Sequence, residues 1–227
     1  MLPGIDVSKW QSGRVKWNRE TTGFAFAKAT EGASYVDPSF REHVKGAREA
    51  GVPIGGYHFG RPKTNPIKSA EQFAIVCLDA GITIPHLALD IEVTDGADPS
   101  RVLDWTQAFV ETLGDRTLIY SYPSFLKTLR IPEDHKVASC ELWIAHYTSA
   151  SQPDLSGTPW VSWRIWQYLG DAGRHTDVMG PVDLNRFNGD LDVWIDPSLA
   201  RERYDASNTP SEWGPITSDQ AMGRIFP

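Results

Sequence analysis

The sequence predicts an α/β fold in which eight β-strands close into one barrel with helices on its outside. Short apolar segments of β type recur along the chain, and amphipathic helical segments separate the early ones. This alternation is typical of parallel strands joined by crossover helices. The length of 227 residues also suits one barrel domain.

The predicted strands are short apolar runs bounded by turn-forming residues. They comprise residues 2–7, 24–30, 52–59, 86–92, 116–122, 142–147, 163–168 and 181–187.

Three segments between the early strands are predicted helices, at residues 38–51, 66–81 and 99–114. Each has apolar residues at helical spacing and ends in glycine, a common helix terminator. After about residue 130 the helical pattern fades, so we expect helices around the first five strands and few around the last three. Residues 1–199 would form the barrel domain, and the polar segment 200–227 is too short for a second domain.

Composition excludes several classes of protein. The formal net charge of −7 argues against a nucleic-acid partner. No apolar run approaches the roughly 20 residues that span a membrane, so no membrane insertion is expected. The amino terminus lacks the basic and apolar regions of a secretory signal, so we expect either synthesis in a cytoplasm or a signal that has been trimmed away. Cys77 and Cys140 are not in a metal-binding spacing and are expected to be free thiols.

Two carboxylates end the apolar segment HLALDIE. Asp90 and Glu92 are separated by one residue, so in a strand they point to the same face, about 7 Å apart. Like charges at that distance raise the pKa of one acid and produce a proton donor near neutral pH, as a glycosidase requires. The segment alone is equally compatible with solvated carboxylates or with ion pairs to Arg or Lys.

Two further acids accompany the first and last predicted strands. Asp6 closes the run LPGIDV, and Asp183 lies within PVDLNRF. These strands become neighbours when the barrel closes, so four acids would ring one mouth. Any one of these acids is as compatible with a structural role as with a functional one, but four together are harder to explain by stability, because like charges in a cleft destabilise the fold. A divalent cation bound to the same acids is the alternative interpretation.

Other polar and aromatic residues lie near the same strand ends. Lys28 is the natural counter-charge, either paired with Asp6 or Glu31 or available to substrate. Aromatic side chains that would line a sugar site are Trp10, Tyr57, Tyr120 and Tyr147, although each alone is more often a core residue. His58 and His146 are interpreted as hydrogen-bonded strand histidines rather than ligands.

Eight motifs together resemble a known family. GIDVSKWQ, FAFAKATEG, GGYHF, LALDIE, LIYSYP, LWIAHY, WQY and VDLNRFNG occur in this order between about residues 2 and 195. They resemble the family-25 glycoside hydrolases, the Chalaropsis-type lysozymes of phages, bacteria and fungi. The resemblance implies an irregular TIM-like barrel with five β/α units followed by three β-strands.

The resemblance also implies an activity, namely hydrolysis of the β-1,4 bond between N-acetylmuramic acid and N-acetylglucosamine in peptidoglycan. The family's D-x-E pair falls on Asp90 and Glu92, with Glu92 as the general acid. Its other catalytic acids fall on Asp6 and Asp183, and Gln167 of WQY joins the expected substrate contacts. No cofactor and no metal are implied, and we expect a monomer whose partner is the peptidoglycan glycan strand.

The resemblance leaves the mechanism and the biological setting open. Asp90 would orient the 2-acetamido group of the substrate for attack on its own anomeric carbon, or water would attack directly with inversion. Phage members often carry a wall-binding module, which we do not find here, and residues 200–227 match no part of the family pattern. The absent signal favours a phage or prophage endolysin that acts on the wall after release. The intact D-x-E strand end argues against a non-catalytic wall-binding barrel. The opening GIDVSKWQ fits a muramidase better than a chitinase-like barrel.

Overall fold

The computed structural model describes residues 1–114, 116–170 and 172–199. The chain divides into two compact units, Met1–Leu191 and Asp192–Pro227, and the first contains the barrel. The predicted tail, residues 200–227, lies outside the described residues, so the predicted domain boundary at residue 199 stays a prediction. Among the helices of the described residues, none is long and apolar enough to cross a membrane.

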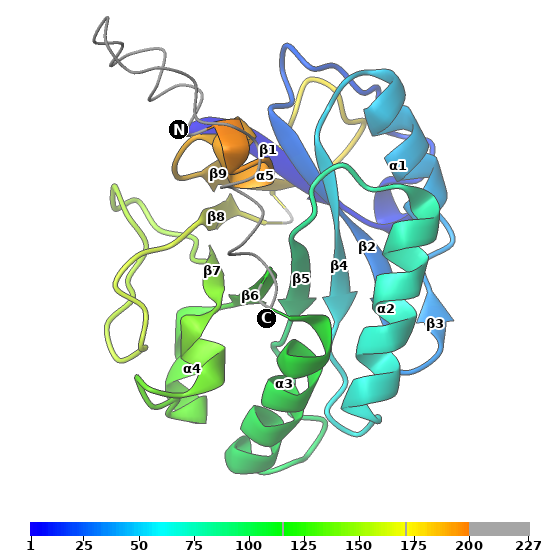
Figure 1. Cartoon of the computed structure of the whole chain (residues 1–227). Coiled ribbons are helices and arrows are strands. Elements are labelled where there is room, and N and C mark those ends of the chain that lie inside the picture. Colours follow the sequence, from blue (N-terminus) through cyan, green and yellow to red (C-terminus); the bar gives the residue numbers. More distant parts are fainter. Residues whose placement is uncertain (115, 171, 200–227) are drawn as a thin grey trace, which may run out of the picture. The chain divides into compact units, whose positions relative to one another are not determined.

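Eight strands of the first unit form a closed barrel (Figure 1). In chain order they are β1 (Leu2–Val7), β2 (Phe24–Glu31), β4 (Ile54–Phe59), β5 (Leu87–Asp90), β6 (Thr117–Ser121), β7 (Glu141–Ala145), β8 (Ile165–Leu169) and β9 (Asp183–Phe187). They follow the order β1-β9-β8-β7-β6-β5-β4-β2, and pairing of β1 with β2 closes the ring. The eight predicted strands are confirmed; the short β3 (Tyr35–Val36), which pairs antiparallel with β2, was not predicted.

Strand direction determines which residues reach the mouth. Neighbouring barrel strands are parallel except at β9, which runs antiparallel to both β1 and β8. The first residue of β9, Asp183, therefore lies at the same rim as the carboxyl ends of the other strands. It is in register with Asp6 near the end of β1.

The predicted α/β barrel with outer helices is also confirmed. The helices of the first unit are α1 (Phe40–Glu49), α2 (Pro66–Ala80), α3 (Pro99–Leu113) and α4 (Pro123–Leu129), and α5 (Leu191–Ile195) begins at the boundary with the second unit. In the described part of the chain, α-helices follow β4, β5 and β6 directly and follow β2 after β3, whereas β1 is followed only by the 3-10 helix Lys9–Gln11. The loop after β1 is therefore free to form part of the mouth.

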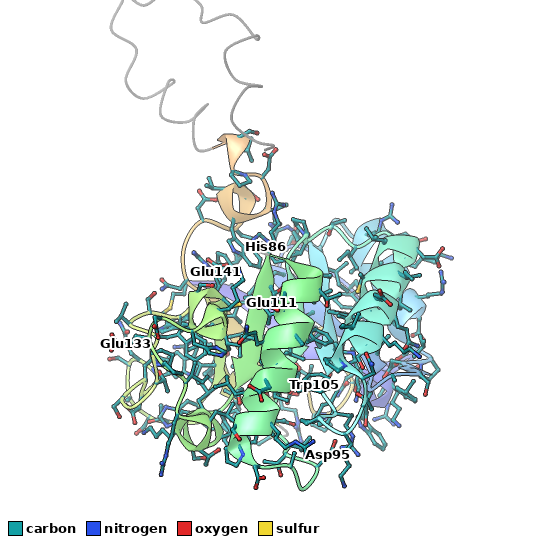
Figure 2. All side chains as sticks on the ribbon, turned by 60° about the horizontal axis from the view of Figure 1, so that its bottom comes forward. His86, Asp95, Trp105, Glu111, Glu133 and Glu141 are labelled. Atoms are coloured by element: carbon teal, nitrogen blue, oxygen red, sulfur yellow. The ribbon has the colours of Figure 1, made fainter. Side chains whose placement is uncertain are left out.

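Capping residues in the sequence determine where α2 begins and ends. The Asn65 side chain accepts a hydrogen bond from the backbone N–H of Lys68 and caps the helix, and Pro66 begins its first turn. Gly81 ends it in the left-handed conformation, with φ of 69°. Figure 2 shows Trp105 and Glu111 on the neighbouring helix α3. His86, which precedes β5, and Asp95, which follows it, lie towards opposite ends of that helix.

Aromatic residues fill the interior of the barrel. The ring centroids of Phe26 and Trp143 are 5.0 Å apart, and those of Phe24 and Phe187 are 5.8 Å apart. A Cβ atom at Gly4 would lie 2.3 Å from the Phe24 ring, so only glycine at position 4 leaves room for the Phe24 ring. The packed aromatic interior forms a floor beneath the mouth.

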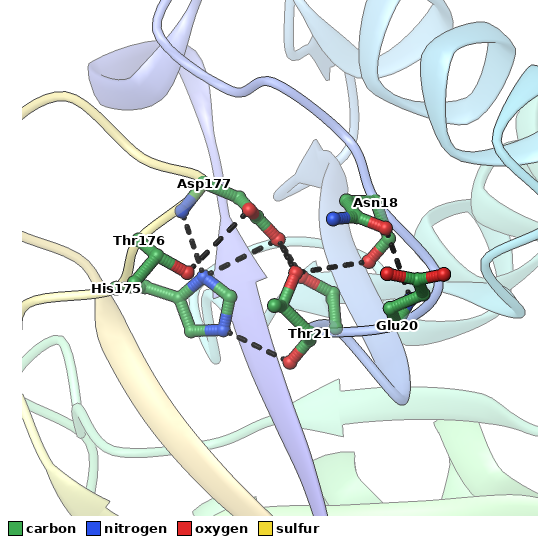
Figure 3. A network of polar contacts seen from close by, with 7 residues as sticks. Asn18, Glu20, Thr21, His175, Thr176 and Asp177 are labelled. Carbon is green, nitrogen blue, oxygen red and sulfur yellow. Dashed lines mark hydrogen bonds and ion pairs between the residues drawn. The ribbon is translucent and has the colours of Figure 1, made fainter.

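A polar network joins the loop after β1 to the loop before β9 (Figure 3). Asp177 accepts hydrogen bonds from the hydroxyls of Thr21 and Thr22, at 2.9 Å for Thr22. His175 Nδ1 lies 3.7 Å from the Asp177 carboxylate, and its Nε2 lies 3.2 Å from the carbonyl oxygen of Thr21. The loop between β1 and β2 is thereby tied to the loop between β8 and β9.

We expect Asp177→Ala to lower the free energy of unfolding by about 1–3 kcal/mol, because two hydroxyls lose a largely buried acceptor. Chemical denaturation measures it. The matched control is Asp79→Ala, which removes an exposed ion pair to Arg41 and should cost about 0–1 kcal/mol. Equal losses in the two variants would contradict a stabilising role for the network.

Candidate active site

The mouth of the barrel contains a cavity of about 220 Å³. Of the ten site residues predicted from the sequence, nine line it: Asp6, Trp10, Lys28, Tyr57, Asp90, Glu92, Tyr120, Gln167 and Asp183. The tenth, Tyr147, lines an adjoining pocket and donates a hydrogen bond to Gln167. The structure therefore brings the whole predicted set together.

Asp90 is the last residue of β5 and is only 7% exposed. Its Oδ1 finds no hydrogen-bond partner among the described residues. Burial raises the pKa of Asp90 well above its ordinary value, and the charge of Glu92 raises it further. A buried acid with an unused oxygen in a cavity is available to a ligand.

Glu92 lies just beyond the end of β5, where the chain continues past the strand. The intervening Ile91 is fully buried away from solvent, and both acids line the cavity, as the alternation predicted. Burial is the largest cause that raises the pKa of Glu92, and the charge of Asp6 adds to it, while Lys28 opposes both. Glu92 thus retains a proton to higher pH than an ordinary glutamate.

Asp6 is held by a network of hydrogen bonds. Its Oδ2 accepts from Gln167 Nε2 at 2.9 Å and from Asn185 Nδ2 at 2.7 Å. The Asn185 Oδ1 in turn accepts from the indole N–H of Trp143 at 2.8 Å. Burial raises the pKa of Asp6, and hydrogen bonds with Asn185, Gln167 and Asp183 counteract that rise.

Lys28 pairs with Glu31, one of the two partners considered from the sequence, with 2.7 Å between Nζ and Oε2. Its Nζ also lies 4.7 Å from the centre of the Phe59 ring. Arg61 reaches the same Glu31 carboxylate at 3.7 Å. The positive charge of Lys28 lowers the pKa values of Asp90 and Glu92 without neutralising either acid by a direct ion pair.

The aromatic residues of the mouth differ in role. Tyr57 and Tyr120 both contact Trp143 edge-on, with centroids 6.3 and 4.9 Å away. Burial raises the pKa of each phenol well above its ordinary value, so both hydroxyls keep their protons. Trp10 is 72% exposed, and Lys9 lies over its ring at 5.2 Å. The buried tyrosines form walls, and Trp10 offers an open ring face to a ligand.

Two pockets extend the central cavity. One, of about 350 Å³, shares Asp6, Trp10 and Asp183 with it and adds Gln11, Arg14, Pro181 and Val182. The other, of about 480 Å³, shares Glu92 and Tyr120 and adds Tyr122, Lys127, His146 and Tyr147, among others. The shared walls make one groove with the acids at its centre, a shape that suits a linear polymer.

Sequence reasoning missed several residues of this site. Asp37, Phe59 and Trp143 line the cavity, and Asn185 supports Asp6. Asn185 could have been found from its position two residues after Asp183 on the same strand face. Asp37 gave no local signal, because the hydrogen bond that ties it to Lys9 spans 28 residues of chain.

The two histidines near strand ends are hydrogen-bonded, as expected. His58 contacts Thr30 Oγ1 through Nδ1 at 2.7 Å and stacks on Phe109, and burial lowers its pKa to about 3. His146 accepts a hydrogen bond from the backbone N–H of Asp154. Within the described ranges, no three or more His, Cys, Asp or Glu side chains are disposed to hold a metal ion. Cys77 and Cys140 do not form a disulfide bond with each other, as predicted.

Acids at the carboxyl ends of barrel strands, within a groove, define a glycosidase-like barrel. The chain matches the model of glycosyl hydrolases family 25 over residues 5–177 and belongs to that family, so it is a glycoside hydrolase. Lysozyme M1 of Streptomyces globisporus is 33% identical over 207 residues, 83% of this chain and 68% of that protein. The N,O-diacetylmuramidase of Chalaropsis sp is 29% identical, covering 84% and 96% of the two chains.

A solved structure agrees with these sequence relationships. The bacterial lysozyme from Streptomyces coelicolor superposes with a TM-score of 0.74 at 30% identity. The match covers 87% of this chain and 98% of that one. The family that the motifs resembled is thereby confirmed.

Asp90 should destabilise the fold at neutral and alkaline pH, since burial opposes its charged form. Its pKa is higher in the folded than in the unfolded state, so the cost grows as pH rises between the two values. We expect Asp90→Asn to raise the thermal midpoint at about pH 8, with the gain shrinking towards about pH 4. Asp104→Asn on the exposed side of α3 is the control. A gain that is independent of pH would contradict this explanation.

Proposed function

We propose that this glycoside hydrolase is an N-acetylmuramidase that cleaves the β-1,4 bond between N-acetylmuramic acid and N-acetylglucosamine in peptidoglycan. The observation that carries the proposal is the pair Asp90 and Glu92 at the centre of a groove that extends to both sides. The names of the two relatives, a lysozyme and an N,O-diacetylmuramidase, support the same substrate.

Glu92 would be the proton donor. It lies where the central cavity meets the pocket lined by Tyr122 and Tyr147, so the scissile bond would cross this boundary. Its raised pKa keeps it protonated until the glycosidic oxygen takes the proton and the leaving sugar departs. The resulting carboxylate then accepts a proton from the attacking water, which restores the acid.

Asp90 would orient the 2-acetamido group of the sugar in the central cavity. Its unpartnered Oδ1 would accept the acetamido N–H, and this hydrogen bond favours the charged form and lowers the raised pKa. The acetamido oxygen would then attack the anomeric carbon as the glycosidic bond breaks, and water would open the ring so formed. Asp6 and Asp183 would stabilise the positive charge that develops at the anomeric carbon.

Glu92→Gln should reduce the turnover of purified cell walls by about 10²–10⁴-fold, because the amide cannot donate the proton. Loss of turbidity measures the activity, and circular dichroism checks the fold. The control is Glu111→Gln on the exposed side of α3 (Figure 2). If Glu92→Gln keeps more than about a tenth of wild-type activity, Glu92 is not the general acid.

The substrate-assisted route predicts retention of configuration, because two displacements occur at the anomeric carbon. Proton NMR of the first-formed reducing end should therefore show the β-anomer before mutarotation. Direct attack by water would give the α-anomer first and would leave the acetamido group without a role. A substrate that lacks the N-acetyl group is the control and should react much more slowly.

We also propose that the protein acts as a monomeric phage or prophage endolysin, made in a cytoplasm and active on the wall after release. Its support is the likeness to the catalytic domain of an endolysin from a bacteriophage of Listeria monocytogenes, at 26% identity and a TM-score of 0.64. Expression in a bacterial cytoplasm should lyse the cells only after the membrane is permeabilised. Lysis of cells with an intact membrane would show that the protein reaches the wall by itself, and would contradict the proposed need for release.

A further inference from the structure

We infer that Tyr147, together with Tyr120, is a positioning residue that orients the amide of Gln167 and thereby keeps Asp6 as a hydrogen-bond-accepting carboxylate of the site. The role assigned to Asp6 rests on the proposed function, whereas the hydrogen bonds do not.

The contacts form a continuous path from the groove to Asp6. The Tyr147 hydroxyl donates to Gln167 Oε1 at 2.6 Å, and the Tyr120 hydroxyl donates to the same oxygen at 3.1 Å. The other end of the amide, Nε2, donates to Asp6 Oδ2 at 2.9 Å. Gln167 is 2% exposed, so water does not readily replace these partners.

The orientation of this amide is chemically consequential. A reversed Gln167 amide would turn its Oε1 towards Asp6 Oδ2, and two acceptors would then face each other unless Asp6 took up a proton. Reversal would also remove the acceptor used by the two phenol protons. Two donors at one end and a carboxylate at the other therefore favour the same orientation.

The second amide of the network is held differently. Asn185 Oδ1 accepts from the indole N–H of Trp143, which is a donor only, so Asn185 Nδ2 must point to Asp6. A phenol hydroxyl can either donate or accept. Asp6 Oδ2 thus has two donors. The orientation of Asn185 is determined by Trp143, whereas the orientation of Gln167 depends on the two tyrosines.

Tyr147 is the member of this network that meets the groove. Its side chain is 57% exposed and lines the pocket beside Glu92. Its hydroxyl fits against Gly170, where a Cβ atom would lie 2.5 Å from the hydroxyl oxygen. The hydroxyl is thus enclosed between Gly170 and Gln167, while the ring faces the pocket.

Several charged or titratable groups face Asp6 from the surrounding strands. They are Lys28 of β2, Tyr57 of β4, Asp90 and Glu92 at the end of β5, Tyr120 of β6 and Asp183 of β9. Lys9 and Asp37 complete the wall. A change confined to the Tyr147 hydroxyl leaves all these groups in place, so its effect on Asp6 isolates the contribution of the Gln167 amide.

Tyr147→Phe should raise the pKa of Asp6 by about 0.5–1 unit, because a neutral donor that opposes the effect of burial is weakened. Carbon-13 NMR of protein labelled at aspartate carboxyls, without substrate, measures this titration. The acidic limb of the kcat/KM profile should move to higher pH by a similar amount. Tyr168→Phe is the matched control: its ring lies beside Trp166 and Arg186, not in the cavity.

Gly170→Ala provides a second variant, because its Cβ would displace the Tyr147 hydroxyl while leaving the tyrosine intact. It should raise the pKa of Asp6 in the same direction, and it replaces Tyr147→Phe if that variant does not fold. An unchanged Asp6 titration in a folded variant of either kind overturns the inference. A shifted titration in a protein inactive on peptidoglycan supports the inference and contradicts only the proposed function.

Discussion

The antiparallel pairing of β9 with β1 is the constraint on which the site depends. Its register places Asp183 beside Asp6 and Asn185 beside Gly4, one step below the rim. β8 pairs with the other edge of β9 and brings Gln167 level with Asn185. Both amides can then reach the same oxygen of Asp6. A parallel last strand would have placed the beginning of the strand, and Asp183 with it, at the opposite end of the barrel.

Burial of the acids is unfavourable, and the surrounding structure offsets only part of it. Amide donors serve Asp6, whereas Asp90 Oδ1 has no partner among the described residues. The aromatic floor of Phe26 and Trp143 keeps water from entering below the cavity. The same exclusion of water that raises the pKa of Glu92 makes a nearby charge act more strongly on it. Stability is thus given up at the mouth, where proton transfer requires perturbed acids.

Much of the site could be predicted because strand periodicity is a local property. The spacing of Asp90 and Glu92 was enough to place both on the cavity side, and closure of eight strands was enough to bring Asp6 towards Asp183. Local patterns do not reveal strand direction. Only the structure shows that β9 is antiparallel to β1, which places Asp183, the first residue of β9, at the rim. Contacts between distant segments, such as Trp143 to Asn185, were equally inaccessible. Residues whose function depends on another side chain's orientation leave little signal in a single sequence.

The charge balance of the mouth follows from the pairing of Lys28. Glu31 takes the nearest position to the Lys28 ammonium, and Arg61 bridges Glu31 to Asp95, so Lys28 and Arg61 are already engaged by acids outside the centre of the cavity. Their charge still reaches Asp90 and Glu92, but it does not cancel the negative charge of the cluster. A cavity with residual negative charge and little water favours a reaction in which positive charge develops on the substrate. Cleavage of a glycosidic bond through an oxocarbenium-like transition state has that requirement, so the ion pairs at the edge of the site and the acids at its centre serve the same chemical end.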